Sequence, residues 1–405
     1  YINQFQPLPM FQPTDPLDIN ARGSVPNIIN NNQYMFRIDH NFSSSDKVFV
    51  RYITDRGKWT NGNLNPNFTY FVQTLNWNLA TQYVKILSPT TLNEFRYGIN
   101  KADDDTFNPR TNTGFDLDSL GLGSFRVTSG RKLTDREVGI PSMIIGGDRD
   151  GGNGWDRNTV HQFADNLSFT RGSHNFKAGF EYRRLILDRA AANVPRGSIG
   201  CCPGGYSLAG WLMGYFSNTE TGEGFPFTAP RQNRWSAYFL DDWKATRKLT
   251  VNLGMRWDFF QTPRDSAGAW RSLRLDILSQ AADGRQLPTV IPEVGLKNWT
   301  PYNRENRYYM PRVGIAYRAT DKWVMRAGAG WFANAQQLNN YTILNLVPPV
   351  SGTIAYQIQQ DILTPFSYEY AGRTYQIQTN RLRPGFINQV GNIYGAGSGR
   401  VSSVR

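Results

Sequence analysis

The sequence predicts an all-β fold of successive antiparallel hairpins, and three observations lead to this prediction. In five segments, apolar and polar residues alternate with a period of two, which is the pattern of strands with one apolar and one polar face. Within each segment, a polar link of about two to five residues divides the alternation, as in a tight hairpin. Between segments, the connections are long and rich in Gly, Pro, Asn and Asp. Alternating short and long connections are typical of a transmembrane β-barrel.

The five hairpins are expected at residues 33–55, 75–100, 161–186, 234–260 and 312–332. Their links have turn-forming compositions: Ser-Ser-Ser-Asp at 43–46, Ser-Pro-Thr-Thr at 88–91, Thr-Arg-Gly-Ser at 170–173, Thr-Arg-Lys at 246–248 and Thr-Asp-Lys at 320–322. The fourth hairpin has the clearest pattern, because apolar residues fill every odd position from Leu249 to Phe259. That strand of about eleven residues is long enough to cross a bilayer when tilted. The others alternate in the same way, through Phe36 and Ile38, Trp77 and Leu79, Phe180 and Tyr182, and Val313 and Ile315.

The long connections span 57–74, 101–160, 188–233 and 261–311. A compact soluble domain rarely carries several unstructured loops of this length. A secreted β-sandwich or propeller is the alternative fold, but a propeller repeats at a regular period and these hairpins do not. In the barrel fold, the short turns are expected at the periplasmic side and the long loops outside the cell. Weaker alternation at 353–360 and 373–379 indicates further strands.

Composition restricts the functional classes. No run of 18 apolar residues occurs, which excludes transmembrane helices but not barrel strands. The 44 Lys and Arg residues are scattered singly, which argues against nucleic-acid binding, while the net charge of +12 suits anionic lipid, lipopolysaccharide or acidic ligands. The three His lie far apart and no catalytic motif occurs, so we expect no enzyme and no cofactor. Adjacent Cys201 and Cys202 are either a redox or metal pair or an inert loop pair.

In a barrel, the polar face of each strand is directed to the lumen. The alternation assigns to this face Arg37, Asp39, Arg51, Glu94, Arg96, Glu181, Arg183, Arg256, Asp258, Arg312, Arg318 and Arg326. These side chains either contact a plug or a solute, or form cross-strand ion pairs that only satisfy the wall. The lumen-facing candidates for solute contact are Arg37, Arg51, Arg96, Arg183, Arg256 and Arg326.

Aromatic residues form two groups. Those at strand ends, Trp235, Trp243, Trp257, Trp323 and Trp331, suit the aromatic girdles of a membrane interface. Those expected in outer loops, Trp155, Tyr206, Trp211, Trp270 and Trp299, suit stacking on a sugar or another solute. The Asp- and Gly-rich stretch 146–156 offers Asp148, Asp150 and Asp156 as ligands for Ca²⁺. It lacks the closing Glu of an EF-hand, however, and an ordinary Asp- and Gly-rich outer loop is the favoured interpretation.

Several hairpins resemble those of TonB-dependent outer-membrane receptors. QFADNLSFTRGSHNFKAGFEYRR at 162–184 resembles their DNLS-T-GxHxxKxGxxYR hairpin, and AYFLDDWKATRKLTVNLGMRWD at 237–258 resembles YxQDDWxxTxxLTLNLGLRY. PRVGIAYRATDKWVMRAGAGWF at 311–332 is similar to PRxGxAYxxxxxxxxRxGxGxF, and SLAGWLMG at 207–214 to ADFLLG. Together with MFRIDHNFSSSDKVFVRY at 35–52, they point to the Oar-like branch, whose members carry a carboxypeptidase-regulatory-like domain ahead of the plug.

The resemblance covers about residues 33–333 and implies a barrel of about 22 strands, a plug, a TonB box and location in the outer membrane. We expect the chain to be part of such a barrel without the plug, because it begins with Tyr1 and shows no plug or terminal aromatic strand. The implied partners are outer-membrane lipid and lipopolysaccharide, the plug, a TonB-type energy-transducing complex and an extracellular solute. The expected function is energised uptake of a siderophore, oligosaccharide or peptide. A structural or adhesive barrel, or a soluble secreted β-protein, is the alternative.

Overall fold

The computed structural model describes residues 10–12, 22–64, 69–107, 142–144, 154–191, 198–200, 218–223, 227–270, 273–280, 286–290, 300–301, 307–345, 352–357, 366–370 and 373–377. Its main sheet contains ten long strands in the order β1-β2-β3-β4-β6-β7-β11-β12-β16-β17, and every neighbouring pair is antiparallel. The order along the chain is therefore also the order in space, as in an up-and-down barrel wall. The all-β antiparallel fold class is confirmed.

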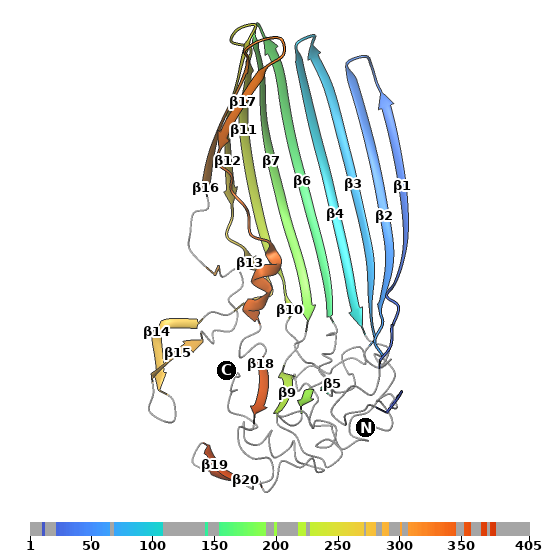
Figure 1. Cartoon of the computed structure of the whole chain (residues 1–405), viewed down its shortest axis with the longest axis vertical. Helices are drawn as coiled ribbons and strands as arrows, with labels where there is room; N and C mark the ends of the chain where they lie inside the picture. Colours follow the sequence, from blue (N-terminus) through green and yellow to red (C-terminus); the bar gives the residue numbers. More distant parts are fainter. Residues whose placement is uncertain are drawn as a thin grey trace.

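The ten strands form the five predicted hairpins and extend several of them. Their bounds are β1 (Ile28–Asn41), β2 (Asp46–Asn61), β3 (Tyr70–Ser88), β4 (Thr91–Phe107), β6 (Gly154–Arg171), β7 (His174–Ala191), β11 (Pro230–Trp243), β12 (Leu249–Phe260), β16 (Arg307–Arg318) and β17 (Val324–Gly330). Figure 1 shows them side by side, with the short connections at the top and the long ones at the bottom. We name these two edges of the sheet the turn end and the loop end.

The strands continue toward the loop end beyond their predicted limits. In β4 the apolar positions end at Ile99, and Lys101, Asp103 and Asp105 follow on the same face while pairing with β3 and β6 goes on. Lys101 Nζ lies 3.1 Å from Asp103 Oδ2, and Arg157 Nη2 lies 2.7 Å from Asp105 Oδ1. Backbone pairing thus outlasts the apolar band, which explains why hydrophobic alternation alone placed the strand ends too early.

Short strands occur within and after the long connections. β10 (Phe227–Thr228) pairs with β7, and β13 (Arg264–Asp265) pairs with β11. A separate sheet has the order β18-β9-β8-β5 and contains β5 (Ser142–Ile144), β8 (Ser198–Gly200), β9 (Asn218–Glu223) and β18 (Gly352–Gln357). Two further pairs are β14 (Leu273–Gln280) with β15 (Gln286–Val290), and β19 (Phe366–Tyr370) with β20 (Arg373–Ile377). The strands predicted near 353 and 373 therefore form, but outside the main sheet.

One face of the main sheet carries large apolar side chains that remain exposed. Ile38 is 72% exposed, Phe180 48%, Met255 47% and Ile315 45%. An apolar surface of this extent is unfavourable in water and is expected where a barrel wall meets lipid. Among the described residues, no helix is both long enough and apolar enough to cross a membrane.

Candidate functional site on the polar face

The opposite, polar face carries all eight arginines assigned to it from the sequence. Residues paired across neighbouring strands share a face, and the register places Arg37 opposite Arg51, Arg312 opposite Gly330 and Arg326 opposite Ala316. The same row of pairs that contains Arg37 and Arg51 continues through Ala80, Gly98 and Gln162 to Arg183 and then Arg234. Arg234 was not among the candidates, because its strand was assigned by its apolar positions.

Four of these arginines are neutralised along their own strand. Arg37 Nη2 lies 2.7 Å from Asp39 Oδ1, Arg183 Nε lies 2.7 Å from Glu181 Oε1, and Arg256 Nε lies 2.8 Å from Asp258 Oδ1. Arg96 pairs with Glu94 in the same i to i+2 arrangement. The expectation of cross-strand ion pairs is wrong for these groups, because residues two apart in a strand also lie on one face. Ion pairs this exposed are screened by water and add little to stability.

Two arginines of the same row form no ion pair with any described residue. Arg51 lies beside Arg37, and its Nε is buried without a hydrogen-bond partner among the described residues. Arg234 lies beside Arg183 and donates only to neutral acceptors, with Nε 2.8 Å from Gln232 Oε1 and Nη2 2.8 Å from the Gln336 carbonyl oxygen. Arg312, Arg318 and Arg326 of the same face likewise form no ion pair with a described residue. Several arginines of this face therefore lack a carboxylate partner in the described part of the chain, and Arg234 has in addition the ring of Phe260 5.5 Å from its guanidinium.

On the polar face, the ring of a tyrosine lies over a glycine of the neighbouring strand. Gly179 stands between Asn166 of β6 and Tyr238 of β11, and the Tyr238 hydroxyl donates to Asn166 Oδ1 at 2.7 Å. An added Cβ at Gly179 would lie 2.4 Å from the Tyr238 ring. The glycine is thus required for the ring to lie flat over β7. The sequence shows Gly at a polar-face position, but the partner becomes visible only with the register.

The segment after β17 folds back over the polar face at the loop end. We call residues 331–345 the strap; it ends in a 3-10 helix, η4 (Leu338–Asn345), that contacts β7, β10 and β11. Arg234 binds its Gln336 carbonyl, and Arg189 Nη1 donates to Asn339 Oδ1 at 2.5 Å. Because β17 lies three strands beyond β11 in the sheet, the strap reaches back across β16 and β12 (Figure 1).

The strap packs on a loop that is organised by one buried carboxylate. Asp265 is 1% exposed and accepts four backbone N–H groups, from Ala229 and Ala267 on Oδ1 and from Ala269 and Trp270 on Oδ2, at 2.6 to 3.1 Å. The ring of Trp270, itself 1% exposed, stacks on Tyr341 of η4 with centroids 5.8 Å apart. Trp270 is therefore a packing residue, and its assignment as an outer-loop contact for a solute is wrong.

The other aromatic candidates have different positions. Trp155 lies in β6 rather than in a loop, on the face opposite the arginine row, with Phe227 5.8 Å and the Arg157 guanidinium 5.3 Å from its ring. Tyr206, Trp211 and Trp299 lie outside the described residues, as do Cys201 and Cys202. The strand-end residues Trp235, Trp243 and Trp257 lie on the apolar face, where a membrane girdle is expected.

The candidate calcium ligands are not brought together in the described structure. Asp148 and Asp150 lie outside the described residues, and Asp156 belongs to β6, where its Oδ1 lies 3.6 Å from Arg189 Nε. No group of three or more His, Cys, Asp or Glu able to hold a metal ion occurs in the part of the chain that the structure describes. The calcium site therefore stays a prediction without structural support.

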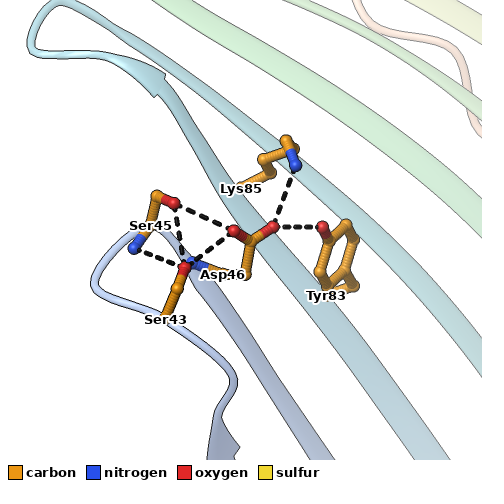
Figure 2. A network of polar contacts seen from close by, with 5 residues as sticks. All are labelled: Ser43, Ser45, Asp46, Tyr83 and Lys85. Carbon is orange, nitrogen blue, oxygen red and sulfur yellow. Dashed lines mark hydrogen bonds and ion pairs between the residues drawn. The ribbon is translucent and has the colours of Figure 1, made fainter.

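A polar network fixes the first turn at the turn end (Figure 2). The Asp46 carboxylate accepts hydrogen bonds from the hydroxyls of Ser43, Ser45 and Tyr83, at 2.8, 2.9 and 2.5 Å, and pairs with Lys85 Nζ at 3.0 Å. The bond from Tyr83, followed by those from Lys85 and the two serines, holds the pKa of Asp46 well below its usual range. The network joins the β1–β2 turn to β3, so it orders a wall element rather than a ligand site.

A ten-stranded antiparallel meander with one lipid-compatible face and one charged face defines a membrane β-barrel wall. The chain matches the family described as outer membrane beta barrel domain over residues 1–396, and it belongs to that family. It is therefore an outer-membrane protein. A comparison with curated proteins finds none that match.

Among solved structures, the chain is similar at low identity to the copper transporter OprC, with 11% identity over 75% of this chain and 37% of that one, and a TM-score of 0.42. The ferric citrate transporter FecA in its unliganded form is 9% identical over 75% of this chain and 36% of that one, with a TM-score of 0.38. The siderophore receptor PiuA from Acinetobacter baumannii is 12% identical over 75% of this chain and 49% of that one, with a TM-score of 0.34. The chain thus spans less than half the length of each of these proteins.

Proposed function

We propose that this chain is part of the barrel of a TonB-dependent receptor that binds a large solute and takes it up with energy from an inner-membrane complex. The observation that supports this most directly is the polar face, where uncompensated Arg51 and Arg234 accompany self-neutralised pairs. A donor that is buried in a purely structural wall needs a partner, and the buried Nε of Arg51 has none among the described residues, so a plug or a solute is the group expected to supply it. The hairpin motifs at 162–184, 237–258 and 311–332 resemble those of the same receptors.

The proposed partners follow from this role. The apolar face contacts outer-membrane lipid and lipopolysaccharide, the polar face meets a plug domain of the same protein, and a TonB-type complex acts on that plug. The solute is a siderophore, an oligosaccharide or a peptide, and the barrel itself catalyses no reaction. A structural or adhesive outer-membrane barrel is the second candidate, because the β5, β8, β9 and β18 sheet adds ordered structure beyond the wall at the loop end (Figure 1).

Uptake and adhesion are separated by one experiment on the full-length protein in outer membranes. Cells expressing it would receive fluorescent ferric siderophore, oligosaccharide and peptide, with and without a protonophore. We expect at least one solute to accumulate, and we expect the protonophore to abolish accumulation while surface binding persists. Binding without accumulation in either condition would favour the adhesive role, and accumulation that ignores the protonophore would contradict energised uptake.

A further inference from the structure

We propose that Arg183 and Arg234 form a binding site for an anionic group of the solute, a carboxylate or a phosphate, and that the strap covers this site until the anion displaces it. The proposal rests on the proposed uptake function, but it concerns binding at a particular place on the wall. It starts from the register, which sets the two guanidinium-bearing residues directly opposite each other on β7 and β11.

Two like charges opposite each other in a sheet repel, so their presence calls for a compensating group. Glu181 supplies one carboxylate, but it binds Arg183 on the same strand and accepts a further bond from Gln162 Nε2 at 2.9 Å. Asp258, the nearest carboxylate of β12 on this face, pairs with Arg256. In the described part of the chain, Arg234 has no carboxylate partner, so one positive charge of the pair remains.

The strap covers the proposed anion site and offers its arginines only neutral hydrogen-bond acceptors. The Gln336 carbonyl oxygen receives Arg234 Nη2, and Asn339 Oδ1 receives Arg189 Nη1. A hydrogen bond between a guanidinium and an anion is about twice as strong as one to a neutral acceptor, and the guanidinium fork suits two oxygens of one carboxylate or phosphate. An anion of the solute would therefore replace the Gln336 carbonyl and weaken the hold of the strap.

Release of the strap is expected to change the fluorescence of Trp270, which lies under it. Tyr341 of η4 is 7% exposed, donates its hydroxyl to Gln336 Oε1 at 2.6 Å and covers the buried ring of Trp270. When the strap leaves, Trp270 gains contact with water, and its fluorescence is expected to shift to longer wavelength. An acidic side chain of a plug is the competing occupant; the loop-end position under a displaceable strap favours the solute.

The test uses the purified full-length protein in detergent at fixed ionic strength. Citrate and tripolyphosphate would be titrated by calorimetry, with sucrose as an uncharged control. We expect both anions to bind, sucrose not to compete with them, and the tryptophan emission to shift to longer wavelength on binding; because the chain has 11 tryptophans, Trp270→Phe should remove this shift if Trp270 is its source. Arg234→Gln should weaken anion binding at least about tenfold, while Arg234→Lys, which keeps the charge without the fork, should give an intermediate loss. Retained heat-modifiable mobility would show that each variant is folded.

Lys177→Gln is the matched control, because Lys177 is exposed on the same face of β7, opposite Leu240 of β11 and near the turn end. It should change the affinity less than about twofold, against the loss of at least about tenfold expected for Arg234→Gln. Asn339→Ala removes one bond of the strap and should tighten anion binding, since less is displaced. Equal losses in Arg234→Gln and Lys177→Gln, or no anion binding to the full-length protein, would overturn the site. If anions bind but no protonophore-sensitive uptake occurs, the anion site is supported and the uptake function is refuted. If a neutral solute is taken up but no anion binds, the uptake function is supported and the anion site is refuted.

Discussion

Gly179→Ala is expected to destabilise the wall strongly although it adds a single methyl group. The new Cβ would lie 2.4 Å and 2.7 Å from two atoms of the Tyr238 ring and 2.6 Å from Asn166 Oδ1, and distances under 3.0 Å force a shift. Moving the ring breaks its hydrogen bond to Asn166, which is worth about 1 kcal/mol. Overpacking adds roughly 1–3 kcal/mol. The expected loss in the free energy of unfolding is therefore about 2–4 kcal/mol.

Gly98→Ala is the matched control on the same face. An added Cβ there meets only the Leu79 carbonyl oxygen at 3.8 Å, which is ordinary contact, so the change should be neutral or stabilise by up to about 1 kcal/mol. Urea unfolding of the full-length protein in micelles, followed by tryptophan fluorescence, measures both variants. Tyr238→Phe should lower the free energy of unfolding only by the contribution of the lost hydrogen bond. In a Tyr238→Ala background, Gly179→Ala should lower the free energy of unfolding less than it does in the wild type. The reasoning fails if Gly179→Ala and Gly98→Ala unfold alike.

Three further predictions test the faces, the loop and the turn. Leu253→Lys puts a charge on the apolar face and should cost about 2–4 kcal/mol of assembled stability, whereas Asn252→Lys on the polar face should cost much less; equal folding yields in vesicles would contradict the face assignment. Asp265→Ala leaves four backbone donors without their acceptor and should raise hydrogen exchange and proteolysis at 263–270, while Asp265→Asn, which keeps one acceptor oxygen, should have a smaller effect; unchanged exchange in both would exclude this role. Because the pKa of Asp46 is lowered on folding, its stabilising contribution is complete above the ordinary value of about 3.9 and is lost as the pH falls below it. Asp46→Asn should thus be less stable than the wild type at pH 7 and approach it below about pH 4; a gap that is independent of pH would refute this.

The sequence predicted the hairpins and the two faces because both are local properties. A period of two in residues such as Leu249 to Phe259 reports the strand and its apolar side without knowledge of any neighbour. What depends on register was not predictable in this way. The opposition of Arg183 and Arg234, and the passage of Tyr238 over Gly179, exist only once β7 and β11 are paired with a particular offset.

Packing between distant segments was a second source of error. Trp270 looked like a free aromatic because it follows a polar loop, but the stacking partner that buries it, Tyr341, lies 71 positions away in the chain. Asp265 carried no motif, since an acceptor of backbone N–H groups needs only a carboxylate and a suitable loop geometry. The strap was missed for the same reason, because its contacts with Arg189 and Arg234 join sequence regions that no periodicity connects.

The distribution of paired and unpaired charge connects these features to function. Arg37, Arg96, Arg183 and Arg256 each have an acid two positions away, so those parts of the polar face are neutral whatever fills the lumen. Arg234 lacks such an acid, although the residue two positions before it, Gln232, is placed to be one and offers a neutral oxygen instead. Replacing Gln232 with Glu would complete the repeated pairing pattern and remove the excess charge beside Arg183. The change also removes the Gln232 Nε2 donor that binds the Gln261 carbonyl oxygen at 2.8 Å, so some loss of stability is expected whatever the role of the wall. If the pair receives an anion, Gln232→Glu should abolish anion binding while the wall stays folded; unchanged anion binding in the folded variant would contradict the site.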